Sequence, residues 1–195
     1  DINRAKIINN NMNNSRLVEV SKYLSLVLRH QPEKIGIKLD PHGWVAIEEL
    51  LKAAKNHKFP IWETELYTVV ENNDKKRFSL DPSGTLIRAN QGHSVEVDLQ
   101  LEPEIPPDIL YHGTVIRVID SIKKTGLQKM SRHYVHLSND ITTARNVAKR
   151  RKGKSIVLVV DAMGMFQDGY NFYLSANNVW LVNEVPHRYL QILDT

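Results

Sequence analysis

The stretch Ser131-Arg-His-Tyr-Val-His-Leu-Ser138 combines the alternation of a short buried strand with side chains suited to binding an anion. Val135 and Leu137 would face a core, because strand side chains alternate with period two. The opposite face would then carry the side chains of Arg132, Tyr134 and His136. An edge strand with a solvated polar side gives the same pattern, so this window alone leaves both interpretations open.

The composition predicts a globular protein of one large or two small domains, with 195 residues, 42% hydrophobic and 25% charged. No apolar run approaches the roughly 18 residues of a membrane span, and the first residues lack a secretory-signal pattern, so we expect a cytoplasmic protein without membrane contact. The absence of cysteine excludes disulfides and thiol nucleophiles. The eight histidines show no metal-ligand spacing, so we expect no metal site.

The net charge of +4 is unevenly distributed, with +1 over residues 1–98, −2 over 99–107 and +5 over 108–195. Residues 145–154 contain six lysines and arginines and no acid. This run is typical of a contact with RNA, and equally of a solvated helix end.

The first half is predicted to consist of helices followed by a hairpin. Residues 1–14 are Asn-rich and read as a poorly ordered tail, and Ser15 then caps a helix that ends before Pro32 and carries Arg29 and His30 in its last turn. Further along we expect a strand over 35–39, helices through Leu50 and over 64–71, and a hairpin over 75–80 and 85–89. Helices before a hairpin indicate a winged-helix-like lobe over 15–98.

The second half begins after an acidic, proline-broken linker over residues 99–107. In the lobe 108–195 we expect a strand over 110–112, then Gly113-Thr114, then a helix over 115–124 with Gly126 after it; such a junction is a ready anion site. A helix over 141–149 and strands over 156–161, 172–174, 179–182 and 189–193 complete an α+β domain.

Several separated motifs resemble the RNA 2′-phosphotransferases over residues 20–190. They are Leu28-Arg-His30, Lys75-Lys-Arg-Phe78, Ile87-Arg-Ala89, Gln91-Gly-His-Ser94, Tyr111-His-Gly-Thr114, Arg132-His-Tyr-Val-His-Leu-Ser138 and Val179-Trp-Leu181. The resemblance implies a winged-helix-like lobe joined to an ADP-ribosyltransferase-like lobe, with the active site between them. It also implies NAD-dependent removal of an internal 2′-phosphate from RNA, as left by one type of tRNA splicing, through an ADP-ribosylated RNA phosphate.

The resemblance also implies the site residues. The catalytic set maps onto Arg29, His30, Arg77 and Arg132, in which guanidinium forks would hold phosphate oxygens and the histidine would move a proton. The expected NAD-binding residues are His112, Gly113, Thr114, Ser131, Tyr134, His136 and Ser138. We expect Gly113 to allow close backbone approach, and Gly126 and Trp180 to be structural.

The chain departs from the family where many members have Asn-Gly-Val-Trp and this one has Asn177-Asn-Val-Trp180. Asn tolerates positive φ, so we expect the turn to survive. One alternative is a mono-ADP-ribosyltransferase acting on a protein or a nucleic-acid end, but such enzymes usually use a late glutamate and the lobe has only Glu184. A non-enzymatic winged-helix nucleic-acid-binding protein is the other, and it leaves the catalytic set unexplained. We expect a monomer.

Overall fold

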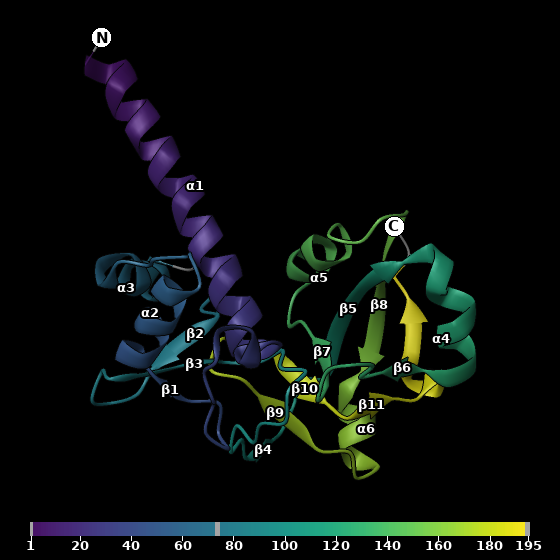
Figure 1. Ribbon diagram of the computed structural model, residues 1–195. Coiled ribbons are helices and arrows are strands. Elements are labelled where there is room, and N and C mark those ends of the chain that lie inside the picture. The colour runs from purple at the N-terminus through teal and green to yellow at the C-terminus, as the bar shows by residue number, and fades with distance from the viewer. Residues whose placement is uncertain (1, 73–74, 194–195) are drawn as a thin grey trace. The chain divides into compact units, whose positions relative to one another are not determined.

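The computed structural model describes residues 2–72 and 75–193, and the chain divides into two compact units, Asp1–Gln100 and Leu101–Thr195 (Figure 1). Each unit has its own hydrophobic core. The division falls within residues 99–107, where the sequence predicts a linker. The fold is mixed, with helices and several antiparallel sheets.

Helix α1 (Ile2–Arg29) supplies one wall of the core of unit 1. Val20, Leu24, Val27 and Leu28 have helical spacing and are fully buried. The helix begins at Ile2 rather than at Ser15, where the sequence analysis expected its start, while residue 1 lies outside the described residues. Residues 2–14 contain neither proline nor glycine, so nothing in them breaks the helix.

The two later helices and the hairpin of unit 1 follow the prediction. Helices α2 (Ile47–Asn56) and α3 (Glu63–Asn72) precede the hairpin of β2 (Phe78–Leu80) and β3 (Leu86–Ala89). The short strand β1 (Val45–Ala46) completes a three-stranded antiparallel sheet in the order β1-β3-β2. Buried residues of the sheet, including Phe78 and Ile87, pack against those of the helices.

The strand expected over residues 35–39 is wrong. The segment begins instead with the 3₁₀ helix η1 (Pro32–Ile35), and no strand follows it. Ile35 and Ile37 are both buried, as alternation predicts, but Gly36 between them has a φ of 72°. That left-handed conformation interrupts the extended backbone that a ladder requires.

Unit 2 contains a three-stranded sheet, a four-stranded sheet and a two-stranded sheet. The first has the order β12-β8-β5, from β12 (Leu190–Ile192), β8 (Ser155–Asp161) and β5 (Ile109–Val115). The second has the order β4-β9-β10-β7, from β4 (Pro103–Glu104), β9 (Phe172–Leu174), β10 (Trp180–Val182) and β7 (Val135–Leu137). The third pairs β11 (Glu184–Val185) with β6 (Leu127–Gln128). Val135 and Leu137 are buried, as predicted.

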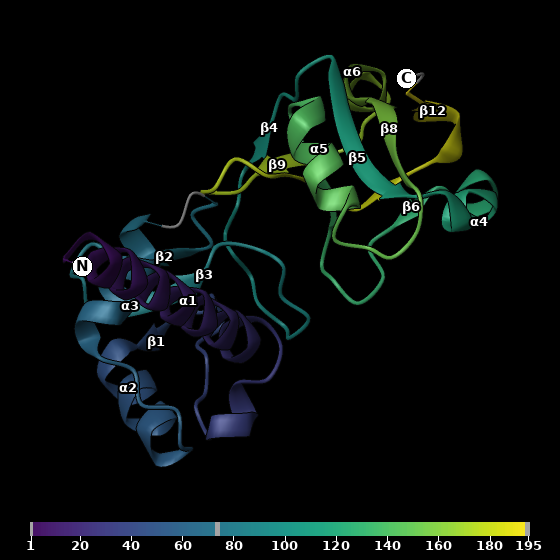
Figure 2. The same cartoon turned by 90° about the horizontal axis from the view of Figure 1, so that it is seen from above.

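The helices of unit 2 lie beside these sheets. Helix α5 (Ile141–Ala148) packs against β5 and β8, as Figure 2 shows. Helix α6 (Ala162–Gln167), which the sequence analysis missed, follows β8 directly with the Asp161 side chain as its cap. The 3₁₀ helix η3 (His187–Tyr189) leads into β12.

The helix expected over 115–124 begins later than predicted. Strand β5 continues through Gly113 and Thr114 to Val115, and is followed by the 3₁₀ helix η2 (Ile116–Val118) and helix α4 (Ile119–Thr125). The cause is the long partner β8, which pairs with all seven residues of β5. Strand β5 therefore passes through Gly113 and Thr114 without meeting a helix N-terminus, so the helix dipole expected to favour an anion at that junction does not act there.

Two predicted turns and one predicted core residue are confirmed. Asn178 has a φ of 61° and its N–H donates to the Ser175 carbonyl at 2.9 Å, so the turn forms without glycine. Gly126 ends α4 with a φ of 71°. Trp180 is buried in the core of unit 2.

Among the described residues, no helix is both long and apolar enough to span a bilayer. Within the same residues, no three His, Cys, Asp or Glu side chains gather as metal ligands.

Candidate active site

Arg29 and His30 lie at the end of α1, where a later segment of unit 1 holds them. The N–H groups of Ser94 and Val95 donate to the Arg29 carbonyl at 2.9 and 3.3 Å. The Ser94 hydroxyl lies 2.8 Å from His30 Nδ1. Both the backbone and the imidazole are therefore fixed by residues more than sixty positions away.

Gly92 lies beside the Arg29 side chain. A Cβ on Gly92 would lie 3.5 Å from the guanidinium carbon and from Nε of Arg29, and the glycine φ is 87°. The arginine therefore lies against bare backbone. Gly92 and Ser94 were not predicted to contact Arg29 and His30. The only sign of their importance in the sequence is that both belong to the family motif Gln91-Gly-His-Ser94.

Arg77 lies immediately before β2, in the same unit. Asn90, which is buried, donates its backbone N–H to the Arg77 carbonyl at 2.9 Å. Its side chain bridges the Lys76 carbonyl at 2.5 Å and the Ser79 hydroxyl at 2.6 Å. Residues 90–95 thus contact both the end of α1 and the start of β2.

Arg88, on strand β3, is half-buried. Its guanidinium lies 4.5 Å from the centre of the Trp44 ring, and Nη1 donates to the His42 carbonyl at 3.3 Å. Burial lowers the pKa of this guanidinium, against the charge of Asp40, which raises it. Arg88 therefore packs the turn before β1 onto β3.

In unit 2, hydrogen bonds connect Arg132, His136 and His112. Arg132 Nη1 donates to His136 Nδ1 at 3.0 Å. The His136 carbonyl accepts from His112 Nδ1 at 2.9 Å, so the second ring nitrogen of His112 carries no proton when the ring is neutral. The structure thus brings together three of the residues predicted for unit 2.

The electrostatics of this group favour a neutral His112. Burial is the largest cause that lowers the pKa of its imidazole below the ordinary 6.5; the bond to His136 opposes it, and the charges of Arg151 and Arg132 lower the pKa further. Burial also lowers the pKa of the Arg132 guanidinium, and the charge of Arg150 adds to that effect.

The other residues predicted to bind NAD lie on β5, next to it or close to β7. Thr114 is two residues along β5 and therefore on the same face, with 1% of its surface exposed. Ser138 exchanges two backbone hydrogen bonds with Tyr111, the neighbour of His112, at 2.8 and 2.9 Å. Tyr134 packs its ring against Tyr173, with centroids 5.4 Å apart. Ser131 lies exposed on the turn before β7.

Gly113 permits a close approach, but the group that approaches is helix α5. A Cβ at this position would lie 1.8 Å from the Ala144 carbonyl oxygen and 2.9 Å from the Ala148 nitrogen. The glycine therefore fixes the helix against the strand that carries His112 and Thr114.

The basic run 145–154 follows this helix, and Arg151 reaches the candidate site. Its Nη1 donates to the Thr114 hydroxyl at 3.3 Å. Arg151 could not be singled out from the sequence, because no local pattern shows which of the six basic side chains contacts β5.

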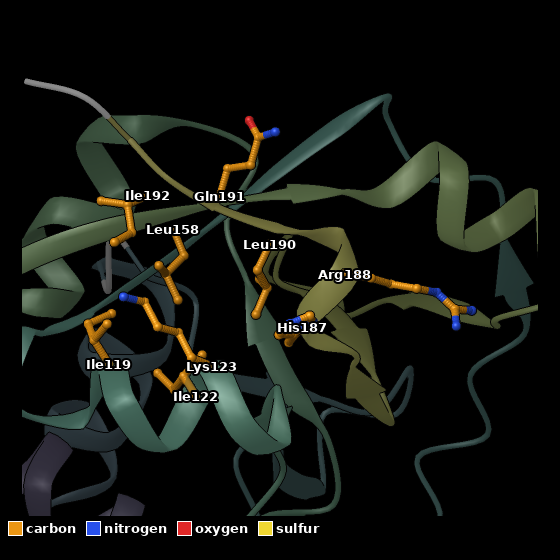
Figure 3. Close-up of a pocket in the computed structure, with 9 residues that line it drawn as sticks. All are labelled: Ile119, Ile122, Lys123, Leu158, His187, Arg188, Leu190, Gln191 and Ile192. Atoms are coloured by element: carbon orange, nitrogen blue, oxygen red, sulfur yellow. The ribbon is translucent and has the colours of Figure 1, made fainter.

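A pocket of about 490 Å³ lies elsewhere in unit 2, between α4 and β12 (Figure 3). Aliphatic side chains such as Ile119, Leu158 and Leu190 line it, while the Arg188 guanidinium points away (Figure 3). None of the predicted site residues lines this pocket. We therefore place the candidate active site on the hydrogen-bonded residues rather than on the pocket.

Comparison with known proteins gives one family. The model of the RNA 2′-phosphotransferase, Tpt1 / KptA family matches residues 15–184. A probable RNA 2′-phosphotransferase of Nostoc punctiforme is 62% identical over 180 residues, covering 92% of this chain and 99% of that protein. Similar proteins of the same description from Streptomyces griseus and Fusobacterium nucleatum are 54% and 47% identical, covering 92% and 89% of this chain and 98% and 97% of their own. The chain therefore belongs to the RNA 2′-phosphotransferase family.

Proposed function

We propose that this chain removes an internal 2′-phosphate from RNA with NAD as the acceptor. The observation that carries the proposal is the connection from Arg132 through His136 to His112. It joins a guanidinium suited to a phosphate with a neutral imidazole suited to accept from a ribose hydroxyl. Family membership supports the removal of a 2′-phosphate from RNA.

In the first step, an oxygen of the RNA 2′-phosphate attacks C1″ of the nicotinamide ribose. The bond from C1″ to the nicotinamide nitrogen breaks, and nicotinamide leaves with the bonding electrons. His112, neutral at pH 7 with Nδ1 held by the His136 carbonyl, would accept a hydrogen bond from a ribose hydroxyl at Nε2. Thr114, Ser131, Tyr134, His136 and Ser138, together with the Gly113 backbone, complete the proposed NAD site.

In the second step, the 2″-hydroxyl attacks the phosphorus and the bond to the RNA 2′-oxygen breaks. The hydroxyl loses a proton and the leaving 2′-oxygen gains one, giving 2′-hydroxyl RNA and ADP-ribose 1″,2″-cyclic phosphate. Arg29, Arg77 and Arg132 would hold the phosphate oxygens, since charge accumulates on them in the transition state. His30 would move the proton; because Ser94 holds Nδ1, we assign the transfer to Nε2.

The finer assignments belong to the same proposal. Unit 1 would be a winged-helix-like lobe that binds RNA, and unit 2 an ADP-ribosyltransferase-like lobe that binds NAD. We further propose that the enzyme works as a cytoplasmic monomer, without a metal, on RNA of the tRNA splice-junction type.

The direct test incubates the protein with NAD and a short RNA that carries one internal 2′-phosphate. We expect nicotinamide, ADP-ribose 1″,2″-cyclic phosphate and the dephosphorylated RNA. If the cyclic phosphate does not form, the proposal is wrong, and an ADP-ribosylated protein or RNA end would favour a mono-ADP-ribosyltransferase instead. Binding of RNA with no turnover would favour a non-enzymatic binding protein.

Arg132→Ala separates the two steps. We expect nicotinamide to be released while ADP-ribosylated RNA accumulates, because the guanidinium is needed most when the phosphate itself is attacked. Rapid-quench gel analysis measures the intermediate, and Arg117→Ala, at an exposed position of η2, is the control. Loss of nicotinamide release would make Arg132 a docking residue instead.

A further inference from the structure

Two arginines of unit 2 make contacts at the candidate site, Arg132 with His136 and Arg151 with Thr114, and Arg150 adds a third positive charge that acts on Arg132. Arg151 donates to Thr114, and Arg150 and Arg151 influence Arg132 and His112 respectively through their charges. Among the described residues, no carboxylate forms an ion pair with Arg132, Arg150 or Arg151, taking 4.0 Å as the longest distance for such a pair. Gathered like charges raise the free energy of the folded protein, and a bound anion would relieve that cost.

The backbone holds two of these cations in place. Helix α5 ends with the N–H groups of Arg150 and Arg151 bonded to the Val147 and Ala148 carbonyls at 3.2 and 3.1 Å. The run closes where the Ile116 N–H donates to the Lys154 carbonyl at 2.9 Å. Both ends are tied to elements of unit 2, so an anion bound here would not have to order a loose loop.

A role in neutralising the end of helix α5 does not explain Arg151. Its guanidinium bonds a hydroxyl on β5, whereas a cation that serves the helix would bond the last carbonyls. A guanidinium has five N–H donors, so the bond to Thr114 leaves others for an anion. That anion would lie beside Thr114, on the strand face that carries His112 two residues away.

We propose that Arg151, held by Thr114, binds the diphosphate of the dinucleotide. The inference rests on the proposed use of NAD. Within the basic run, it assigns Arg151 to the diphosphate rather than to RNA.

The test compares ligands with and without the diphosphate. Binding of NAD and of ADP-ribose is measured by titration calorimetry, and binding of nicotinamide riboside, which lacks the diphosphate, by NMR. We expect Arg151→Gln to weaken NAD and ADP-ribose by about tenfold to a hundredfold, as for a lost bond to a charged group, and to leave nicotinamide riboside within about twofold. Arg151→Lys keeps the charge without the fork and should give a smaller loss.

Lys152→Gln is the matched control, because it removes the same charge from the same exposed run. It should leave the NAD affinity within about twofold, since the charge of an exposed side chain is screened by salt. Unchanged NAD binding in Arg151→Gln, an equal loss for nicotinamide riboside, or a loss of affinity for 2′-phosphorylated RNA alone would each overturn the inference. Failure of the unaltered protein to bind NAD would instead contradict the proposed function.

Discussion

Three histidine rings are held through the same nitrogen, Nδ1, by three different kinds of group. Ser94 holds His30 through a hydroxyl, the His136 carbonyl holds His112, and Arg132 holds His136. The carbonyl can only accept and the guanidinium can only donate, so His112 has its proton on Nδ1 and His136 does not. The hydrogen-bond partners of these two rings therefore determine which tautomer each one adopts.

His112 makes the stability of unit 2 depend on pH. Burial lowers its folded-state pKa below 6.5, whereas in the unfolded chain the ring takes up a proton near 6.5. The unfolded state therefore binds more protons as the pH falls, and stability decreases from about pH 6.5 downward. Urea unfolding at pH 7.5 and 5.5 should show a smaller decrease for His112→Asn; equal decreases would contradict a depressed pKa.

Ser94→Ala tests how His30 is positioned. The change removes the hydroxyl at 2.8 Å from Nδ1, and we expect turnover to fall by about threefold to tenfold, the value of one hydrogen bond. Because Ser94 is exposed, the melting temperature should hardly change. Ser94→Thr keeps the hydroxyl and should retain most of the rate. Full activity in the alanine variant would show that the bond does not orient the ring.

Strand β5 and helix α5 depend on one glycine for their contact. Gly113→Ala would place a methyl group 1.8 Å from the Ala144 carbonyl, and backbone on both sides cannot move away cheaply. We expect a loss of about 3 kcal/mol or more in the free energy of unfolding, measured by urea denaturation.

Gly169→Ala is the control within the same unit. Unlike Gly113, this glycine has a positive φ, of 98°, and nothing lies within 4 Å of its added Cβ. A loss of about 1–2 kcal/mol is expected there from backbone conformation alone. A loss at Gly113 no larger than the loss at Gly169 would show that α5 is free to move outward.

Elements with a clear period were predictable from the sequence, and those decided by a partner were not. The alternation of Val135 and Leu137 and the helical spacing of Val20, Leu24 and Val27 gave β7 and the buried part of α1. The end of β5 was missed because the seven-residue pairing with β8 sets it. Likewise, residue types and family motifs indicated the candidate site, but the bond from Arg151 to Thr114 depends on how the basic run folds back.

At the scale of the whole molecule, the proposed catalytic residues come from both units. Arg29, His30 and Arg77 belong to unit 1, and Arg132 belongs to unit 2. If all four act on one phosphate, as proposed, then variants that combine changes from both units should show non-additive effects on the rate.

A double-mutant cycle between Arg29→Ala and Arg132→Ala tests whether the effects on the rate are non-additive. Each change alone should reduce the second-step rate by about tenfold to a hundredfold or more. If both guanidiniums bind the same phosphate, the double variant should lose less than the product of the two effects, because interacting residues are not additive. Single-turnover decay of the ADP-ribosylated RNA measures the rates. Simple multiplication would mean that the two arginines act independently.

The short strand β4 bears on where the chain can be cut. Pro103 and Glu104 pair with Tyr173 and Phe172 of β9, so the second half of the expected linker belongs to the sheet of unit 2. A fragment that begins at residue 108 would leave an open edge on β9, and open edges invite pairing with other chains. Unit exchange or circular permutation of this protein should therefore cut near residue 100 and carry β4 with the C-terminal half.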